Sequence, residues 1–115
     1  MFKIRTSLNN RSNAQKIGRV LLETHAAVSV HIREAESIFA WEDKINNAVE
    51  YEMEILCRDP QAVYNIITEN HPYQIPEFLV FDLDASDDIE KWCNDWCSQY
   101  GENNWHSPWS SARVN

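Results

Sequence analysis

Histidine side chains are the first candidates for chemistry in this sequence. His71 follows an apolar helical pattern, and a neutral imidazole is a ligand type that copper and zinc accept. One histidine cannot hold a metal alone, so further ligands would have to come from Glu77, His31 or a neighbouring subunit. The structural alternative for His71 is a helix C-terminal histidine that interacts with the last carbonyl groups before Pro72.

Two cysteines lie four residues apart near the C-terminus. Cys93 and Cys97 would share one face of a helix, where two thiolates could hold a soft metal ion. A zinc site normally needs a second pair of ligands, which the sequence does not offer. Both cysteines also lie on an apolar stripe with Ile89 and Trp96, so we expect them to be small buried hydrophobic residues.

Three glutamates alternate along one segment. Glu50, Glu52 and Glu54 would point to the same face of a strand, where a row of carboxylates could attract a divalent cation. His31 and Arg33 would lie on the adjacent strand, so we expect cross-strand ion pairs instead.

No motif for catalysis or nucleotide binding occurs. A Gly-x-Ser-x-Gly elbow is missing, and Cys57 has no histidine near it in sequence. With only two glycines, Gly18 and Gly101, the chain lacks glycine-rich phosphate loops. We therefore expect a protein that is not an enzyme.

Composition narrows the class further. The 115 residues suit one domain, and the net charge of −8 disfavours nucleic acid as a partner. No apolar stretch approaches the roughly 20 residues that span a bilayer, and no signal-peptide core follows the N-terminus. The odd number of cysteines favours free thiols in a reducing compartment. We expect a cytoplasmic protein without a membrane segment.

Hydrophobic periodicity predicts the elements of the first half. After a short strand at residues 2–7, apolar residues at helical spacing predict a helix over 12–25, capped by Ser12. Alternation then predicts an antiparallel hairpin of 27–45 and 47–58, with a reversal over 43–47. The large apolar residues change parity along its first strand, for which we expect a β-bulge between about 33 and 37.

The second half predicts three more elements. Asp59-Pro60 starts a helix, which His71-Pro72 ends. The apolar run 78–81 is typical of a strand covered on both faces, and Ser86 caps a third helix.

The order β-α-β-β-α-β-α fits an α+β, ferredoxin-like βαββαβ plait with an added C-terminal helix. We divide the chain into this domain, residues 1–100, and an aromatic tail, residues 101–115. We expect the tail to be ordered at least through Trp109 and to stabilise an assembly. The hairpin is longer than a small plait needs, so its ends should project and pair with neighbouring chains.

Three segments resemble the CutA family of divalent-cation-tolerance proteins. Trp41-Glu42-Asp43-Lys44 resembles a W-E-G-K turn, and His71-Pro72-Tyr73-Gln74-Ile75-Pro76-Glu77 resembles an H-P-Y-x-x-P-E strand entry. The helix with Trp92 follows at the right distance, so the resemblance covers residues 2–97. It implies a tight PII-like homotrimer, associated with copper and other divalent cations.

The chain departs from the family pattern at several turns. The turn after the first strand, Ser7-Leu8-Asn9-Asn10, lacks the cysteine that the family offers as a copper ligand, and Val28-Ser29 lacks a second one. Asp43 replaces the glycine of the W-E-G-K turn, and Arg33-Glu34 replaces a Pro-Gly bend. His71 remains as the metal candidate, for copper or another divalent cation bound weakly.

The resemblance thus implies a trimeric ion- or small-ligand-binding module in metal tolerance or signalling. One alternative is a structural assembly domain without a ligand. Another is an enzyme that uses an inter-subunit cleft, with the same ligand candidates, Trp41, Lys44, His71, Tyr73 and Glu77.

Overall fold

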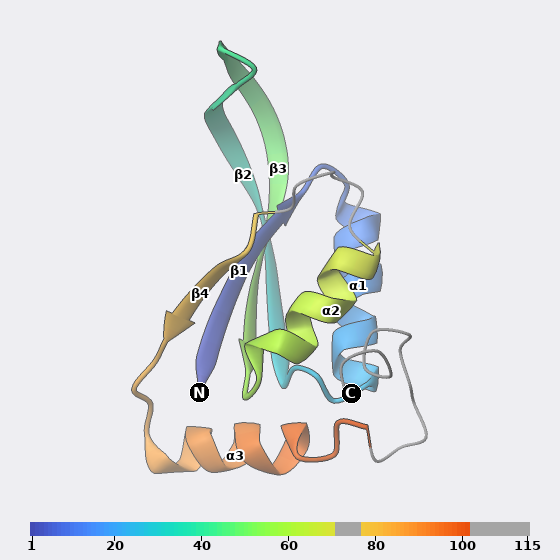
Figure 1. The fold of residues 1–115 in the computed structure, drawn as a ribbon, viewed down its shortest axis with the longest axis vertical. Helices are drawn as coiled ribbons and strands as arrows, with labels where there is room; N and C mark the ends of the chain where they lie inside the picture. Colours follow the sequence, from blue (N-terminus) through green and yellow to red (C-terminus); the bar gives the residue numbers. More distant parts are fainter. Residues whose placement is uncertain (71–76, 102–115) are drawn as a thin grey trace.

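The computed structural model describes residues 1–70 and 77–101, which form four strands and three helices (Figure 1). They follow the predicted order: β1 (Phe2–Leu8), α1 (Arg11–Glu23), β2 (Ser29–Trp41), β3 (Lys44–Cys57), α2 (Pro60–Asn70), β4 (Leu79–Asp82) and α3 (Asp87–Cys97).

The strands form one antiparallel sheet in the order β2-β3-β1-β4. Helices α1 and α2 pack against one face of it, and α3 lies beyond the end of the sheet near the N-terminus (Figure 1). This is the ferredoxin-like plait with an added helix, so the predicted fold class is confirmed. We call the sheet face opposite α1 and α2 the open face.

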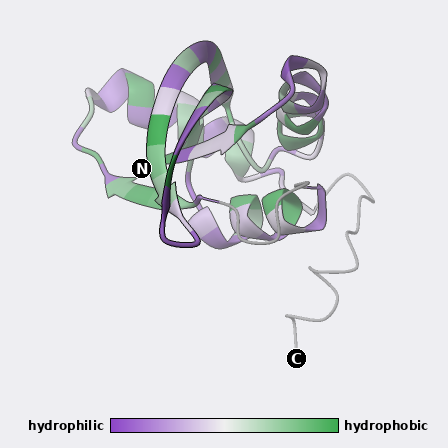
Figure 2. Cartoon of the chain, turned by 90° about the horizontal axis from the view of Figure 1, so that it is seen from above, coloured by the Kyte–Doolittle hydropathy of each residue, from purple (hydrophilic) through white to green (hydrophobic). Residues whose placement is uncertain are grey.

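The core lies between the sheet and the two helices. Ile4, Met53 and Ile55 are fully buried beneath apolar residues of the helices, which include Leu21 and Ile66. Seen from above, hydrophobic and hydrophilic bands alternate along the elements, as one-sided burial requires (Figure 2).

Helix α1 begins one residue earlier than predicted and is capped differently. Asn10, not Ser12, is the N-cap: its backbone is extended and its side chain accepts a hydrogen bond from the Asn13 N–H at 3.1 Å. Asparagine is among the most favourable N-cap residues, and Asn10 already accepts a hydrogen bond from a free backbone N–H of the first turn. Ser12 is therefore not needed as the cap. The helix also ends earlier, because His25 adopts a left-handed φ of 65°.

The predicted β-bulge is wrong. The register between β2 and β3 is unbroken, from Ser29 opposite Leu56 to Trp41 opposite Lys44. The tip half of the hairpin projects beyond the helices (Figure 1). Neither of its faces is an inner face within one chain, so the large apolar residues there need not keep the alternation seen nearer the core. Both faces of the projection therefore carry exposed apolar residues, with Ile38 on one and Phe39 on the other.

The reversal of the hairpin is tighter than predicted. Glu42 and Asp43, rather than residues 43–47, make the turn, and both have positive φ, 53° and 60°. Two left-handed residues are the requirement of the two-residue turn that matches the twist of a hairpin. Accordingly, β2 extends to Trp41 and β3 begins at Lys44.

Strand β4 also differs from its prediction. It is an edge strand, and Leu79, Val80 and Phe81 are 41%, 50% and 39% exposed. The apolar run is therefore not covered on both faces, because α3 packs against the end of the sheet and not over β4. Both edges of the sheet, β2 and β4, carry exposed apolar residues.

Gly18 of α1 packs against Val30 of β2. A Cβ atom built on Gly18 would lie 3.4 Å from Val30 Cγ1, which is ordinary contact. Glycine inside a helix costs up to about 1 kcal/mol relative to alanine. We therefore expect Gly18→Ala to raise the free energy of unfolding by about 0.5–1 kcal/mol in urea denaturation. Gly18→Val, which is bulkier, should instead lower it, and a loss of stability with alanine would contradict the expectation.

Candidate functional site

Charged side chains form a connected network across the open face. Arg33 of β2 pairs with both Glu52 and Glu54 of β3. On the other side of β3, Lys3 Nζ lies 3.6 Å from Glu54 Oε2, and Arg5 Nε lies 3.4 Å from Glu52 Oε2. The predicted cross-strand pairing with Arg33 is confirmed, and β1 supplies two further partners.

Glu77, two residues before β4, joins this network. Its Oε1 atom lies 3.7 Å from Arg5 Nε and accepts a hydrogen bond from Ser7 Oγ at 3.4 Å. Arg5 therefore sits between two carboxylates, those of Glu52 and Glu77. The sequence did not reveal this position of Arg5, because the pairing of β1 with both β3 and β4 creates it.

Trp41 and Lys44 lie opposite each other at the tip of the hairpin. Trp41 is eight residues beyond Arg33 along β2, which is about 26 Å at the rise of a strand. Within one chain, these two candidates are thus far from Glu77. The remaining two, His71 and Tyr73, lie outside the described residues.

The three cysteines are buried free thiols, as predicted for Cys93 and Cys97. Burial raises the pKa of Cys57 to about 12, and the nearby Cys97 and Cys93 add to the rise. Burial also raises the pKa of Cys97 to about 12 and that of Cys93 in the same direction. All three thiols are therefore protonated and unreactive near neutral pH.

His25 and Trp96 hold α3 against the end of α1. Their rings stack with centroids 3.8 Å apart, and His25 Nδ1 lies 3.0 Å from the carbonyl oxygen of Trp96, to which it donates. His25 and Trp96 are 71 positions apart in the sequence, so no local pattern predicts their contact. On the same helix, Cys93 and Cys97 pack with Val28 and with Leu56, which lies near the end of β3.

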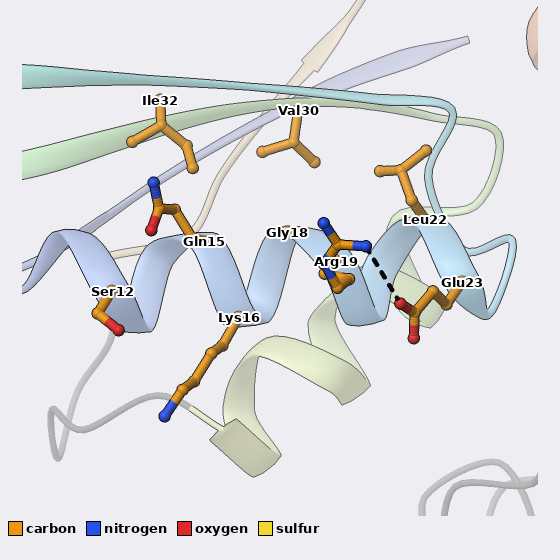
Figure 3. A pocket seen from close by; sticks show the side chains of 9 residues that line it. All are labelled: Ser12, Gln15, Lys16, Gly18, Arg19, Leu22, Glu23, Val30 and Ile32. Carbon is orange, nitrogen blue, oxygen red and sulfur yellow. Dashed lines mark ion pairs between the residues drawn. The ribbon is translucent and has the colours of Figure 1, made fainter.

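A groove of about 710 Å³ runs between α1 and the edge strand β2 (Figure 3). Val30 and Ile32 point from β2 toward the helix, and Leu22 faces them from α1. Lys16 points away, and Arg19 pairs with Glu23 at 3.7 Å. The groove has an apolar floor beside an unpaired strand edge.

Residues 1–70 and 77–101 of one chain do not fit a divalent cation. They contain no group of three or more histidine, cysteine, aspartate or glutamate side chains arranged to hold a metal. On the open face, Glu52, Glu54 and Glu77 are engaged by Lys3, Arg5 and Arg33. Among the same residues, none of the helices has the length and apolarity to cross a bilayer.

Comparisons with known proteins identify the class and then the family. The fold resembles that of the PII-like protein CutA from Nostoc, with a TM-score of 0.79 and 22% identity over 84% of this chain and 97% of that one. CutA1 from Ehrlichia chaffeensis gives a TM-score of 0.78 and 27% identity over 84% and 94% of the two chains. The architecture is thus that of PII-like, ferredoxin-fold proteins.

Sequence comparison supports the same assignment. Residues 3–96 match the family described as CutA1 divalent ion tolerance protein. The divalent-cation tolerance protein CutA of Yersinia pestis (strain Pestoides F) is 34% identical over 91 residues, 74% of this chain and 75% of that protein. The chain belongs to the CutA1 divalent ion tolerance family, and the resemblance seen in its motifs is confirmed.

Proposed function

We propose that this chain is a homotrimeric ion- or small-ligand-binding module of divalent-cation tolerance, with its ligand site between subunits. Family membership supports the role, and the relatives' name describes tolerance of divalent cations. The main support for a site between subunits is the distance between its candidate residues within one chain. Trp41 and Lys44 lie at the projecting tip, about 26 Å from the network that holds Glu77.

The surface of one chain supports assembly. Ile38, Ile45 and Val49 are 68%, 81% and 52% exposed on one face of the projection. Monomeric proteins rarely leave such patches in water, and the unpaired edges of β2 and β4 would invite aggregation unless another copy covered them. A ring in which an edge of each copy meets the other edge of the next closes without free edges.

A site completed by a second copy is consistent with the lack of a three-ligand group within residues 1–70 and 77–101 of one chain. A second copy would bring its hairpin tip, with Trp41 and Lys44, toward Glu77 of the first. His71 is the proposed metal ligand there, for copper or another divalent cation bound weakly. We also propose a cytoplasmic location and a non-enzymatic role; the free thiols are consistent with a reducing compartment.

Subunit mixing tests the shared site. We expect titration calorimetry with Cu²⁺, Zn²⁺ and nucleotides to find a ligand, and Lys44→Ala and Glu77→Gln each to weaken its binding at least tenfold. Trimers re-formed from an equal mixture of the two variants should regain about a quarter of the sites, because each needs an intact tip and an intact Glu77 from different copies. No recovery would place the site within one chain, and a trimer that binds none of these ligands would favour a purely structural assembly.

We further propose that residues 101–115, which lie outside the described residues except for Gly101, stabilise the trimer. Trp105 and Trp109 could each bury on the order of 200 Å² against an apolar partner. We expect truncation after Tyr100 to lower the melting temperature of the trimer by several degrees in differential scanning calorimetry. An unchanged melting temperature and an unchanged trimer would show that the tail contributes nothing.

A further inference from the structure

The groove between α1 and β2 is large enough to hold bulky apolar side chains. Its volume of about 710 Å³ lies within the size range of clefts that bind drug-sized molecules. Leu22, Val30 and Ile32 form its apolar floor, and Gly18 contributes no side chain to fill it (Figure 3). An exposed apolar floor of this kind is typical of a surface that another segment covers.

The rim of the groove offers little to a charged partner. Arg19 pairs with Glu23, and Lys16 points away from the groove (Figure 3). The other two polar residues of the rim, Ser12 and Gln15, are neutral. An occupant therefore needs large apolar groups for the floor and neutral polar groups for the rim, because a charge placed there would lose water without gaining a partner.

Residues 103–111 of the tail have this composition. They include Trp105 and Trp109 and, in a chain with 24% charged residues, no aspartate, glutamate, lysine or arginine. Pro108 disfavours a helix, and an extended chain would place the two indole rings on the same side, about 13 Å apart. The groove-lining residues of α1 span positions 12–23, which is about 16 Å along the helix. Both rings can therefore lie in the groove at once.

The described chain ends beside this groove. Helix α3 finishes below the C-terminal end of α1 (Figure 1), and Tyr100 lines a small cavity together with His25. The His25 N–H in turn donates to the carbonyl oxygen of Leu22 at 3.1 Å. Gly101 has a φ of 82°, a left-handed conformation in which a chain turns away from a helix end. Four extended residues reach about 13 Å, so Trp105 can reach Leu22 without any change of the fold.

We propose that the tail, residues 101–115, binds in the α1–β2 groove of its own chain, with Trp105 toward Leu22 and Trp109 toward Ile32. The tail then lies on the helix side of the sheet and leaves the backbone edge of β2 free to meet the next copy. Covering the floor beside this edge holds β2 in place for that contact. The proposal deepens the stabilising role proposed above for the tail and rests on it.

Photo-cross-linking in the full chain tests this binding mode. Trp109 is replaced by p-benzoyl-phenylalanine, an aromatic residue that joins to neighbouring C–H groups under ultraviolet light. We expect mass spectrometry to find position 109 joined mainly to the peptides of α1 or β2 that line the groove, within one chain. Gln15 points into the groove, so Gln15→Trp should fill it and lower the yield of this product at least tenfold (Figure 3). Lys16→Trp is the matched control and should leave the yield unchanged, because Lys16 points away.

The proposal is overturned if position 109 joins to another part of the chain, or to a second copy, which doubles the mass on a denaturing gel. An unchanged yield with Gln15→Trp would overturn it as well. If circular dichroism shows that the Trp109 replacement does not fold, Trp105 is replaced instead and the same outcomes apply. Truncation after Tyr100 measures the melting temperature wherever the tail binds, so a failure of this binding mode is distinguishable from a failure of the stabilising role.

Discussion

Ile45→Asp should convert the proposed trimer into monomers. Ile45 is 81% exposed in one chain and lies in the apolar face of the projection with Ile38 and Val49. Covering this side chain in an assembly would contribute about 2 kcal/mol, and an unpaired aspartate there adds the cost of burying a charge. We expect a loss of at least about 3 kcal/mol per subunit, which is more than 100-fold in the dissociation constant.

Light scattering at micromolar concentration measures this effect. The matched control is Lys16→Gln, which makes the same change of −1 in net charge on the outer side of α1, away from the hairpin (Figure 3). The control should remain trimeric with its melting temperature unchanged. A monomer for the unchanged protein, or a trimer that tolerates Ile45→Asp, would mean that this face of the hairpin is not an interface between copies.

The elements that the sequence predicted well are those with a local cause. The apolar stripe of α1 repeats at helical spacing along one continuous segment. The start of α2 at Asp59-Pro60 and the cap of α3 at Ser86 each depend on residues within one turn of the helix. In each, the side chain that satisfies the first backbone donors lies beside the helix in sequence.

Two predictions failed where large apolar residues are exposed in one chain. The bulge in β2 and the covered position of β4 both followed from the rule that large apolar residues point inward. Phe39 and Leu79 are exposed in one chain, so the rule does not hold at these positions within a single copy. In the proposed assembly, another copy would cover them. Apolar periodicity reports which residues are buried in the assembly and does not say which copy buries them.

The candidate site also contains some contacts that the sequence could predict and others that it could not. The pairing of Glu52 and Glu54 with Arg33 could be predicted, because adjacent strands of a hairpin fix it. The contact of Glu77 with Arg5 could not, since it joins strands separated by about seventy residues. The stack of His25 on Trp96 spans a similar distance in sequence and likewise depends on how α3 packs.

The protein should lose stability steeply in alkaline solution because of its buried thiols. Cys57 is fully buried, and burial raises its pKa from 9.0 to about 12. The folded state therefore holds the proton more tightly than the unfolded state. This contribution to stability is complete below pH 9 and is lost as the pH rises toward 12. We expect a loss of about 1.4 kcal/mol per pH unit from Cys57 alone.

Urea denaturation at pH 8 to 11 measures this slope, and Cys57→Ala isolates the thiol from the other groups that titrate there. At pH 8 the variant should be less stable by about 1 kcal/mol, the cost of the lost sulfur contacts. Above pH 9 the free energy of unfolding falls in the unchanged protein, because its unfolded state loses the Cys57 proton before its folded state does. The variant lacks this thiol, so the two free energies of unfolding should become equal at about pH 10. Ile55→Val, a core substitution of similar cost without a titrating group, should stay a constant distance below the unchanged protein. Parallel curves for Cys57→Ala would instead mean that Cys57 ionises in the folded chain as readily as in the unfolded one, which its position at the centre of the packed β3 end does not allow.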